Sequence, residues 1–374
     1  MKATSFNTGW TCRHLGSSAP GTPVTLPHDA MLAEERSQTS AGGTNTGWFA
    51  GYDYLYEKHF TPDAAQAAQC AVLEFEGVYH NAEVHLNGEK IASCPYGYSD
   101  FYADLTGKLL PGRDNVLEVI AHNADQPNSR WYSGAGIYRP VTLWTAPARH
   151  ILPDGVQVRT LSIDPAEVEV TVQTTASGAV AVAILDGEQT VATAQAESNG
   201  KAVLQVQIPN AKLWSPDSPA LYRCRAMFGD DCAETTFGVR TLSWGDDGFL
   251  LNGKRVILLG ACVHHDHGVL GACCYPEAEE RKVRLLQKVG YNAVRCAHNP
   301  CSKAFLDACD RLGMLVMDEL RVLSSSDEGL SQLKTIIRRD RNHPSVIIWC
   351  LGNEEPAIQG TEKGRMIVER MKAV

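Results

Sequence analysis

The alternation of apolar and polar residues changes character along the chain and divides it into three segments. In the first, residues 1–148, short stretches alternate with a period of two, as in half-buried strands, and helical periodicity is almost absent. Asn87-Gly88 separates two of these stretches, and this dipeptide is a strong hairpin signal because both turn positions require positive φ. Many short strands joined by tight turns predict a jelly-roll sandwich.

The second segment, residues 149–240, also consists of period-two stretches without a helical pattern. The clearest are residues 167–172, 179–185 and 201–206, with Asp186-Gly187 as a turn. About ninety residues of short strands are typical of an immunoglobulin-like sandwich. No group of catalytic residue types stands out here, so we interpret this segment as a spacer.

The third segment, residues 241–374, changes to alternating strand and helix patterns. Continuous apolar stretches are typical of strands buried on both faces of a parallel sheet, and the amphipathic stretches between them of crossover helices. The expected strands are residues 256–260, 293–295, 315–318 and 346–351, and the expected helices are residues 277–289, 302–312 and 330–338. Repeated strand–helix units predict part of a (β/α) barrel.

Each expected strand of the third segment is followed by ionisable or amide side chains. The four groups are His264 to His267, Arg295 with His298, Asp318 with Glu319, and Asn353 with Glu354. In a barrel, the carboxyl ends of the strands meet at one mouth, where active sites lie. One such residue would more often be structural, but four groups in succession favour an active site.

Asn353 and Glu354 allow two interpretations. A carboxyl group at the end of a barrel strand, half shielded by the wall, can have the raised pKa that a general acid needs. Alternatively, Asn353 is the N-cap of a helix, and Glu354 and Glu355 are favourable in its first turn. Spacing alone leaves both open.

Two further stretches carry candidate chemistry. The loop at residues 128–139 holds three aromatic residues, two arginines and two glycines, which suits stacking on a sugar; its composition alone favours the alternative, a packed loop that locks two sheets together. His264 to His267 contains a His-x-His pair that could bind a transition metal, but the other strand ends supply no obvious third soft ligand.

Charge and composition exclude several classes of protein. A net charge of −9 and a pI near 5.7 argue against nucleic-acid binding. No apolar run approaches the ~20 residues that cross a bilayer, and the N-terminus lacks the core of a secretory signal. We therefore expect a cytoplasmic protein whose 12 cysteines are free thiols. No Cys-x-x-Cys pair occurs, so a structural zinc site is not expected.

The chain resembles glycoside hydrolase family 2, and most of all its bacterial β-galactosidases. Residues 292–300 and 340–354 are similar to the two family signatures, and residues 130–139 and 260–268 to the β-galactosidase branch. The resemblance covers essentially the whole chain. It implies a sugar-binding jelly roll, an immunoglobulin-like sandwich and a TIM barrel at residues 1–148, 149–240 and 241–374.

The resemblance also implies roles for five residues and a carbohydrate substrate. Glu354 would be the general acid/base, and Asn353 would bond the 2-hydroxyl of the sugar. His265 and His298 occupy positions where the family places histidines around the sugar. Arg130 occupies a position from which the jelly roll of some members reaches into the sugar site. Several family members use Mg²⁺ near the acid/base, but its ligands are not identifiable from this sequence.

One departure from the family pattern concerns the nucleophile. Retention needs a second carboxylate ~5–5.5 Å from the first, and family members supply it from a later strand, beyond Val374 here. About 125 residues follow residue 249, against ~250 for a whole barrel, so only four of the eight strands are expected. None of Glu319, Glu328, Glu355 and Glu362 stands in the nucleophile's expected sequence position. We therefore expect the N-terminal part of a longer enzyme, inactive alone.

The leading hypothesis is thus a retaining hydrolase of terminal β-galactosides. β-Glucuronidase and β-mannosidase share the architecture and stay open as alternatives. A non-catalytic carbohydrate-binding module and, more remotely, a metal-dependent hydrolase built on His265 and His267 are alternatives from other classes. A half barrel would expose sheet edges and apolar helix faces, which favours self-association, so a homo-oligomer also stays open.

Overall fold

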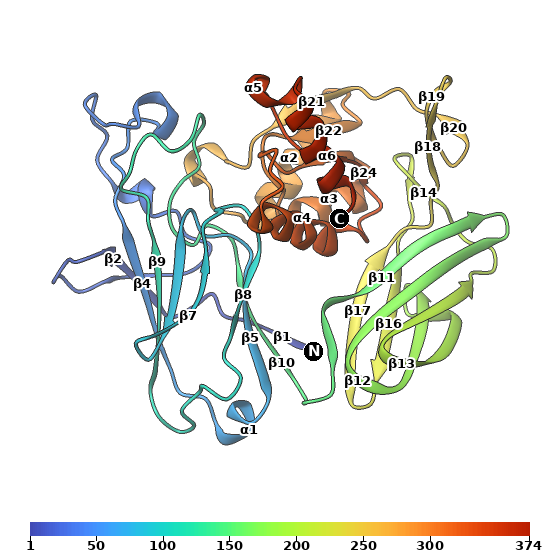
Figure 1. Ribbon diagram of the computed structural model, residues 1–374, viewed down its shortest axis with the longest axis horizontal. Coiled ribbons are helices and arrows are strands. Elements are labelled where there is room, and N and C mark those ends of the chain that lie inside the picture. Colours follow the sequence, from blue (N-terminus) through green and yellow to red (C-terminus); the bar gives the residue numbers. More distant parts are fainter. The chain divides into compact units, whose positions relative to one another are not determined.

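The structure, a computed structural model, describes residues 1–374 and consists of two compact units (Figure 1). The first unit contains residues 2–146 together with residues 265–278, and the second contains Met1, residues 147–264 and residues 279–374. None of the helices is both long and apolar enough to cross a membrane. The domain boundaries expected near residues 148 and 240 stay predictions.

The first unit is the predicted jelly-roll sandwich, with two antiparallel sheets of order β1-β10-β5-β8 and β3-β2-β4-β9-β6-β7. The strands are β1 Lys2–Ser5, β2 Trp10–His14, β3 Thr22–Val24, β4 Tyr54–Phe60, β5 Cys70–Phe75, β6 Ala82–Leu86, β7 Glu89–Cys94, β8 Phe101–Asp104, β9 Asn115–Ala121 and β10 Val141–Ala146. Short helical turns lie at η1 Ala30–Ala33, η2 Gly43–Thr46, α1 Ala64–Ala67 and η3 Gly268–Leu270. Asn87 and Gly88, with φ of 52° and 83°, form the predicted β6–β7 turn.

A buried carboxylate fixes residues 265–278 within the first unit. Asp29 is 2% exposed and accepts four hydrogen bonds. The donors are the backbone N–H groups of Met31 (3.2 Å), Ala135 (3.0 Å) and Ala272 (2.9 Å) and the hydroxyl of Tyr132 (2.7 Å). Burial raises the pKa of Asp29 in spite of these donors. One side chain thus joins three stretches that are distant in the sequence.

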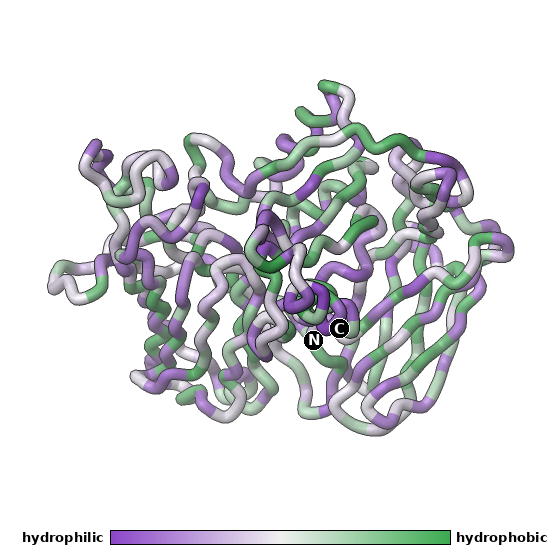
Figure 2. Tube along the Cα trace, turned by 45° about the horizontal axis from the view of Figure 1, so that its top comes forward, coloured by the Kyte–Doolittle hydropathy of each residue, from purple (hydrophilic) through white to green (hydrophobic).

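The second unit begins with the predicted immunoglobulin-like sandwich. Its sheet has the order β11-β12-β16-β17, and β13 also pairs with β12. The strands are β11 Ile151–Ile163, β12 Ala166–Asp186, β13 Gln189–Gln207, β14 Trp214–Ser215, β15 Ser218–Pro219, β16 Tyr222–Phe228 and β17 Asp231–Phe237. The expected strands at residues 167–172 and 179–185 are two parts of the long strand β12. Figure 2 shows how hydrophobic and hydrophilic residues alternate along these strands.

The second unit continues with a small antiparallel sheet and then a parallel one. The antiparallel strands are β18 Leu242–Gly245, β19 Gly248–Leu251 and β20 Lys254–Arg255. The parallel sheet has the order β21-β22-β23-β24, with β21 Gly260–Val263, β22 Ala293–Cys296, β23 Leu315–Glu319 and β24 Val346–Cys350. Its helices are α2 Pro276–Lys288, α3 Lys303–Leu312, α4 Asp327–Asp340, α5 Pro356–Gln359 and α6 Glu362–Lys372. This arrangement confirms the partial barrel.

Two expected elements of the partial barrel begin three or more residues away from the predicted start. The stretch expected as its first strand, residues 256–260, contributes only Gly260, because the side chain of Asn292 bonds the backbone just before β21. Its amide donates to Ile257 O (2.9 Å) and accepts from Leu259 N (2.8 Å). Helix α4 starts three residues before the expected Leu330, because Ser326 caps it by accepting from Gly329 N (3.1 Å).

Residues 340–346, which we call the interdomain segment, bind the immunoglobulin-like sandwich to the partial barrel. Asn342 Oδ1 accepts from Val158 N (2.9 Å), and Nδ2 donates to Val156 O (2.8 Å) and Thr235 Oγ1 (3.0 Å). Arg240 donates from the sandwich side to Pro344 O and Val346 O, the latter at 2.7 Å. Burial lowers the pKa of Arg240 to about 10.

His343 anchors the interdomain segment to helix α3. Its Nδ1 lies 2.6 Å from Asp310 Oδ2, and the other oxygen of Asp310 accepts from Ser345 N at 3.0 Å. Burial alone lowers the pKa of His343, but the charge and hydrogen bond of Asp310 outweigh it and raise that pKa to about 9. The interdomain segment, which leads into β24, therefore has a structural role.

Replacement of Asn342 by alanine should weaken the second unit. The substitution leaves Val158 N and Val156 O without their side-chain partner, so the free energy of unfolding in urea should fall by about 2–3 kcal/mol. The matched control is Asn199→Ala on the exposed surface of β13, which should change it by less than about 0.5 kcal/mol. Equal effects of the two substitutions would contradict the anchoring role of Asn342.

The ion pair of His343 should make stability depend on pH. Because its pKa is raised from an ordinary ~6.5 to about 9, the stabilisation is complete below ~6.5 and is lost as the pH rises through about 9. Urea unfolding should show a decline of up to about 3 kcal/mol across that window, absent in His343→Gln. His59→Gln, in an exposed pair with Asp114, should retain the decline. A wild-type profile that is flat across the window would refute the coupling.

Candidate active site

The carboxyl ends of β22, β23 and β24 bring a connected set of polar side chains to one edge of the parallel sheet. Arg295 lies in β22, with His298 two residues beyond the strand, and Glu319 is the last residue of β23. Asn353 and Glu354 follow β24. Because neighbouring strands are parallel, their carboxyl ends bring these groups to the same edge of the sheet.

Arg295 links the three strand ends. Its Nε donates to Glu319 Oε2 (2.6 Å) and its Nη2 to Asn353 Oδ1 (2.8 Å). His298 Nδ1 lies 2.9 Å from the second oxygen of Glu319, whose side chain is 0% exposed. Partial burial alone would lower the pKa of Arg295, but the hydrogen bond and charge of Glu319 outweigh it and raise that pKa. The two oxygens of the buried carboxylate thus contact two nitrogen atoms, Arg295 Nε and His298 Nδ1.

The contact with Arg295 determines which way the amide of Asn353 points. A guanidinium can only donate, so the atom it contacts must be the amide oxygen. Asn353 is 7% exposed, and its Nδ2 is buried without a hydrogen-bond partner in the protein. Buried donors of this kind are rare in folded proteins and call for an explanation such as a ligand. The amide is therefore arranged to donate to a bound molecule.

Glu354 is exposed and has a left-handed backbone conformation, with φ of 47°. This conformation is uncommon for a residue with a side chain and is found preferentially at functional sites. Its neighbours are fixed: Asn353 N donates to Arg321 O (3.1 Å), and the carboxylate of Glu355 accepts from Leu323 N (3.1 Å). Helix α5 begins only at Pro356, after Glu355 as its N-cap. The alternative with Asn353 as N-cap is therefore wrong.

The remaining candidates lie partly in the other unit. His264 faces His298 edge-on, with ring centroids 6.1 Å apart, in the second unit. His265 belongs to the first unit, where its ring lies 5.3 Å from Tyr98 and 5.5 Å from Tyr138. The structure thus brings Asn353, Glu354 and His298 together at one sheet edge, and places His265 within the jelly-roll unit.

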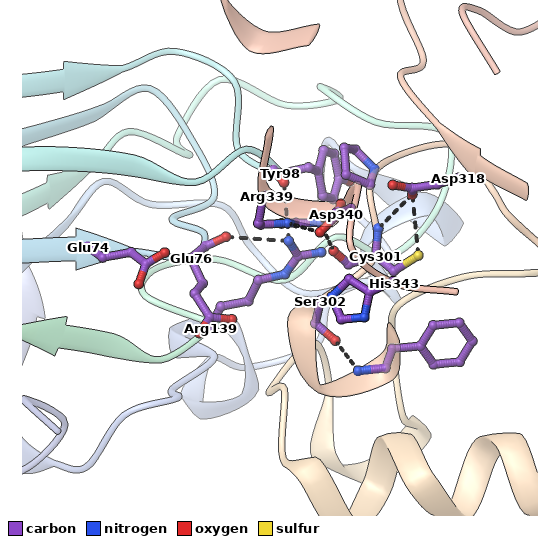
Figure 3. A network of polar contacts seen from close by, with 12 residues as sticks. Glu74, Glu76, Tyr98, Arg139, Cys301, Ser302, Asp318, Arg339, Asp340 and His343 are labelled. Atoms are coloured by element: carbon purple, nitrogen blue, oxygen red, sulfur yellow. Dashed lines mark hydrogen bonds and ion pairs between the residues drawn. The ribbon is translucent and has the colours of Figure 1, made fainter. Parts of the chain in front are cut away.

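The loop at residues 128–139, also in the first unit, supports the interpretation of a packed loop over much of its length. Arg130 is exposed, whereas Tyr138 and Arg139 are fully buried. Figure 3 shows Arg139 among the backbone carbonyls of the jelly roll, where its Nη1 donates to Tyr98 O at 3.1 Å. The second half of the loop is a packed structural element, and in the first half only Arg130 is exposed. Sugar contacts of Arg130 and His265 stay predictions.

A metal ion does not fit the residues around Glu354. The two groups of three side chains whose ligand atoms lie close enough to share an ion are Cys296, Cys301 and Asp318, and Asp307, Asp310 and His343. Neither group includes Glu354, and Glu319 is already engaged by Arg295 and His298. Neither includes a histidine of residues 264–267. The Mg²⁺ that the family resemblance implies thus finds no ligand set here.

Sequence reasoning missed the pairing of Arg295 with Glu319. Both residues were visible at the ends of expected strands, but pattern alone could not show that they bond each other. The signal available was the presence of an arginine and a glutamate at the ends of adjacent parallel strands, a position where opposite charges meet.

A parallel half barrel that follows two β-sandwiches in the sequence, with Asn-Glu after its fourth strand, defines a class of multidomain glycoside hydrolases. Three family models match in succession: glycosyl hydrolase 2 galactose-binding domain-like at residues 10–148, glycosyl hydrolases family 2 at residues 154–240, and its TIM barrel domain at residues 243–327 and 324–374. The chain belongs to glycoside hydrolase family 2.

Individual relatives agree with this assignment. A β-galactosidase from Bacteroides ovatus is 36% identical over 93% of this chain and 46% of its own length. A putative β-glucuronidase from Formosa agariphila is 32% identical over 88% of this chain and 34% of its own. The crystal structure of a family 2 member from Bacteroides cellulosilyticus superimposes with a TM-score of 0.91, at 32% identity, over 100% of this chain and 55% of its own. The chain spans about half the length of the relatives it matches.

Loss of Arg295 should destabilise the second unit through Glu319. Arg295→Ala leaves a carboxylate with 0% exposure without its cation, and breaking a buried pair in this way costs at least about 3 kcal/mol. Because Arg295 itself is 28% exposed, we expect the free energy of unfolding in urea to fall by about 3 kcal/mol. Arg284→Ala, which removes an exposed pair with Glu280, is the control and should cost less than about 1 kcal/mol. A cost for Arg295→Ala as small as the control's would disprove the buried pair.

Proposed function

We propose that the complete protein is a retaining glycosidase that hydrolyses terminal β-galactosides, with Glu354 as general acid/base. The observation that carries the proposal is the arrangement at the end of β24, where Arg295 turns the amide of Asn353 so that its buried Nδ2 can donate. Glu354 follows directly and is exposed. A hydrogen-bond donor for a sugar hydroxyl and a carboxyl group for proton transfer thus lie side by side.

In the proposed reaction, Asn353 Nδ2 donates to the 2-hydroxyl of the sugar, a hydrogen bond that strengthens in the transition state. Glu354 gives its proton to the leaving oxygen as the glycosidic bond breaks. It then takes a proton from the water that releases the sugar from the glycosyl-enzyme intermediate. His298, held by Glu319, lies at the same edge of the sheet and would border the sugar.

The proposal requires a second carboxylate as nucleophile, and Glu319 does not qualify. Its side chain is fully buried, and its two oxygens are taken by Arg295 and His298. The carboxylate of Glu355 is likewise occupied by Leu323 N. We propose that a strand later in the barrel than β24 supplies the nucleophile, so that residues 1–374 alone hold the acid/base without its partner.

Galactosides and glucuronides are both supported as substrates by relatives, one a β-galactosidase and one a putative β-glucuronidase. A uronic acid carries a carboxylate that needs a free cation, and Arg295 is committed to Glu319 and Asn353. This commitment favours a neutral sugar. β-Mannosidase and a purely carbohydrate-binding role remain alternatives, and self-association and a cytoplasmic location stay predictions.

The test is hydrolysis of a chromogenic aryl β-galactoside by the 374-residue chain and by the chain extended through a complete barrel. We expect turnover only in the extended chain, with kcat lowered by about 10²–10⁴ in Glu354→Gln. Glu328→Gln, on the exposed face of α4, is the matched control and should keep full activity.

Three outcomes would count against the proposal. Turnover by residues 1–374 alone would show that the nucleophile lies within them. Full activity of Glu354→Gln in the extended chain would remove its role as acid/base. Hydrolysis of an aryl β-glucuronide or β-mannoside, but not of the galactoside, would retain the mechanism and replace the substrate.

A further inference from the structure

A second cluster of reactive side chains lies in the core of the partial barrel, between the sheet and helix α3. Cys296 is the last residue of β22, Cys301 lies in the loop before α3, and Asp318 is in β23. All three are nearly inaccessible, at 4%, 6% and 1% exposure. Their sulfur and carboxylate oxygen atoms all lie within 4.8 Å of one another, and Figure 3 shows Cys301 beside Asp318.

The spacing of these atoms suits three corners of a tetrahedral metal site. With Zn–S bonds near 2.3 Å and Zn–O bonds near 2.0–2.2 Å, tetrahedral geometry separates two sulfurs by about 3.8 Å and a sulfur from an oxygen by about 3.5 Å. Cys301 Sγ lies 3.3 Å from Asp318 Oδ1. Small side-chain adjustments would therefore be enough to bind an ion.

One oxygen of the Asp318 carboxylate has no N–H donor. Its Oδ1 accepts from the backbone N–H groups of Cys301 (3.3 Å) and Glu319 (3.1 Å). Its Oδ2 is buried and is hydrogen-bonded by no N–H group, and the carboxyl group interacts with the neighbouring side chain of Asp340. A buried oxygen without an N–H donor is costly in a folded protein, and beside two thiols it is a ready metal ligand.

The backbone around Cys301 is already fixed. Arg339 Nη2 donates to Cys301 O (2.6 Å), and the same guanidinium forms a two-point ion pair with Asp340, with contacts of 2.5 and 2.6 Å. On the other side, Ser302 caps α3 by accepting from Phe305 N at 3.2 Å. Ligands held before the metal arrives lose little conformational freedom on binding.

We propose that Cys296, Cys301 and Asp318 bind one Zn²⁺ ion, with a water molecule as the fourth ligand. The two thiols and the carboxyl group lose their protons to solvent as the Zn–S and Zn–O bonds form. Two sulfur ligands favour Zn²⁺ over Mg²⁺, which prefers oxygen alone. The site is buried, and it joins β22, the loop before α3 and β23.

This proposal departs from the expectation drawn from cysteine spacing. The absence of a Cys-x-x-Cys pair predicts that the chain has no structural zinc site. Here the two cysteines are separated by four residues, and the third ligand comes from the next strand of the sheet. Only the parallel pairing of β22 with β23 brings it within reach.

The experiment uses the full 374-residue chain, produced with Zn²⁺ and freed of loosely bound metal. We expect about one zinc per chain by elemental analysis, as for a single site. Replacement by Co²⁺ should give the near-ultraviolet charge-transfer band of cobalt–thiolate bonds, which histidine or oxygen ligands do not produce. Cys296→Ser and Cys301→Ser should lose most of the zinc and the band.

The matched control is Cys309→Ser, because Cys309 is fully buried in the same core cluster but is not one of the three ligands. It should keep the zinc and the band. Wild-type protein without stoichiometric zinc, or zinc bound without a thiolate band, would overturn the proposal whether or not the variants fold. An intact mass that shows a Cys296–Cys301 disulfide in place of bound metal would also overturn it.

Discussion

The candidate site depends on one guanidinium. Arg295 neutralises Glu319, a carboxylate that no solvent reaches, and at the same time accounts for the orientation of the Asn353 amide. A buried charge without a partner would destabilise the fold. The ion pair is therefore needed for the stability of the partial barrel, whatever its role in the candidate site. The same two contacts bring β22, β23 and the end of β24 together. Stability and the placement of Glu354 are therefore coupled through a single side chain.

The stretch of residues 340–354 serves two purposes in succession. Its first half binds the immunoglobulin-like sandwich through Asn342 and Pro344 and helix α3 through His343. Its second half is β24 and the Asn-Glu pair. The sandwich was interpreted from sequence as a spacer, but its hydrogen bonds fix the chain just before β24. We infer that it helps to determine where the strand, and thus Glu354, is held.

Much of this architecture could be predicted from sequence because it depends on local patterns. The three fold types, the Asn87-Gly88 turn, and strands β22 to β24 follow from periodicity and turn chemistry. The start of β21 could not be predicted in this way, because it depends on the side chain of Asn292, 32 residues beyond Gly260. Sequence patterns also do not reveal two groups of residues, the Arg295–Glu319 pair and the cluster of Cys296, Cys301 and Asp318. Both arise where neighbouring parallel strands pair, and no short sequence motif predicts them.

The central claim is that Glu354 is the acid/base of a retaining reaction. Its most direct test is the addition of azide to Glu354→Gln in the chain extended through a complete barrel, with an activated aryl β-galactoside as substrate. Azide needs no general base, so it should restore turnover and yield β-galactosyl azide with retained configuration. Turnover unchanged by azide, or an azide product of inverted configuration, would contradict the role assigned to Glu354.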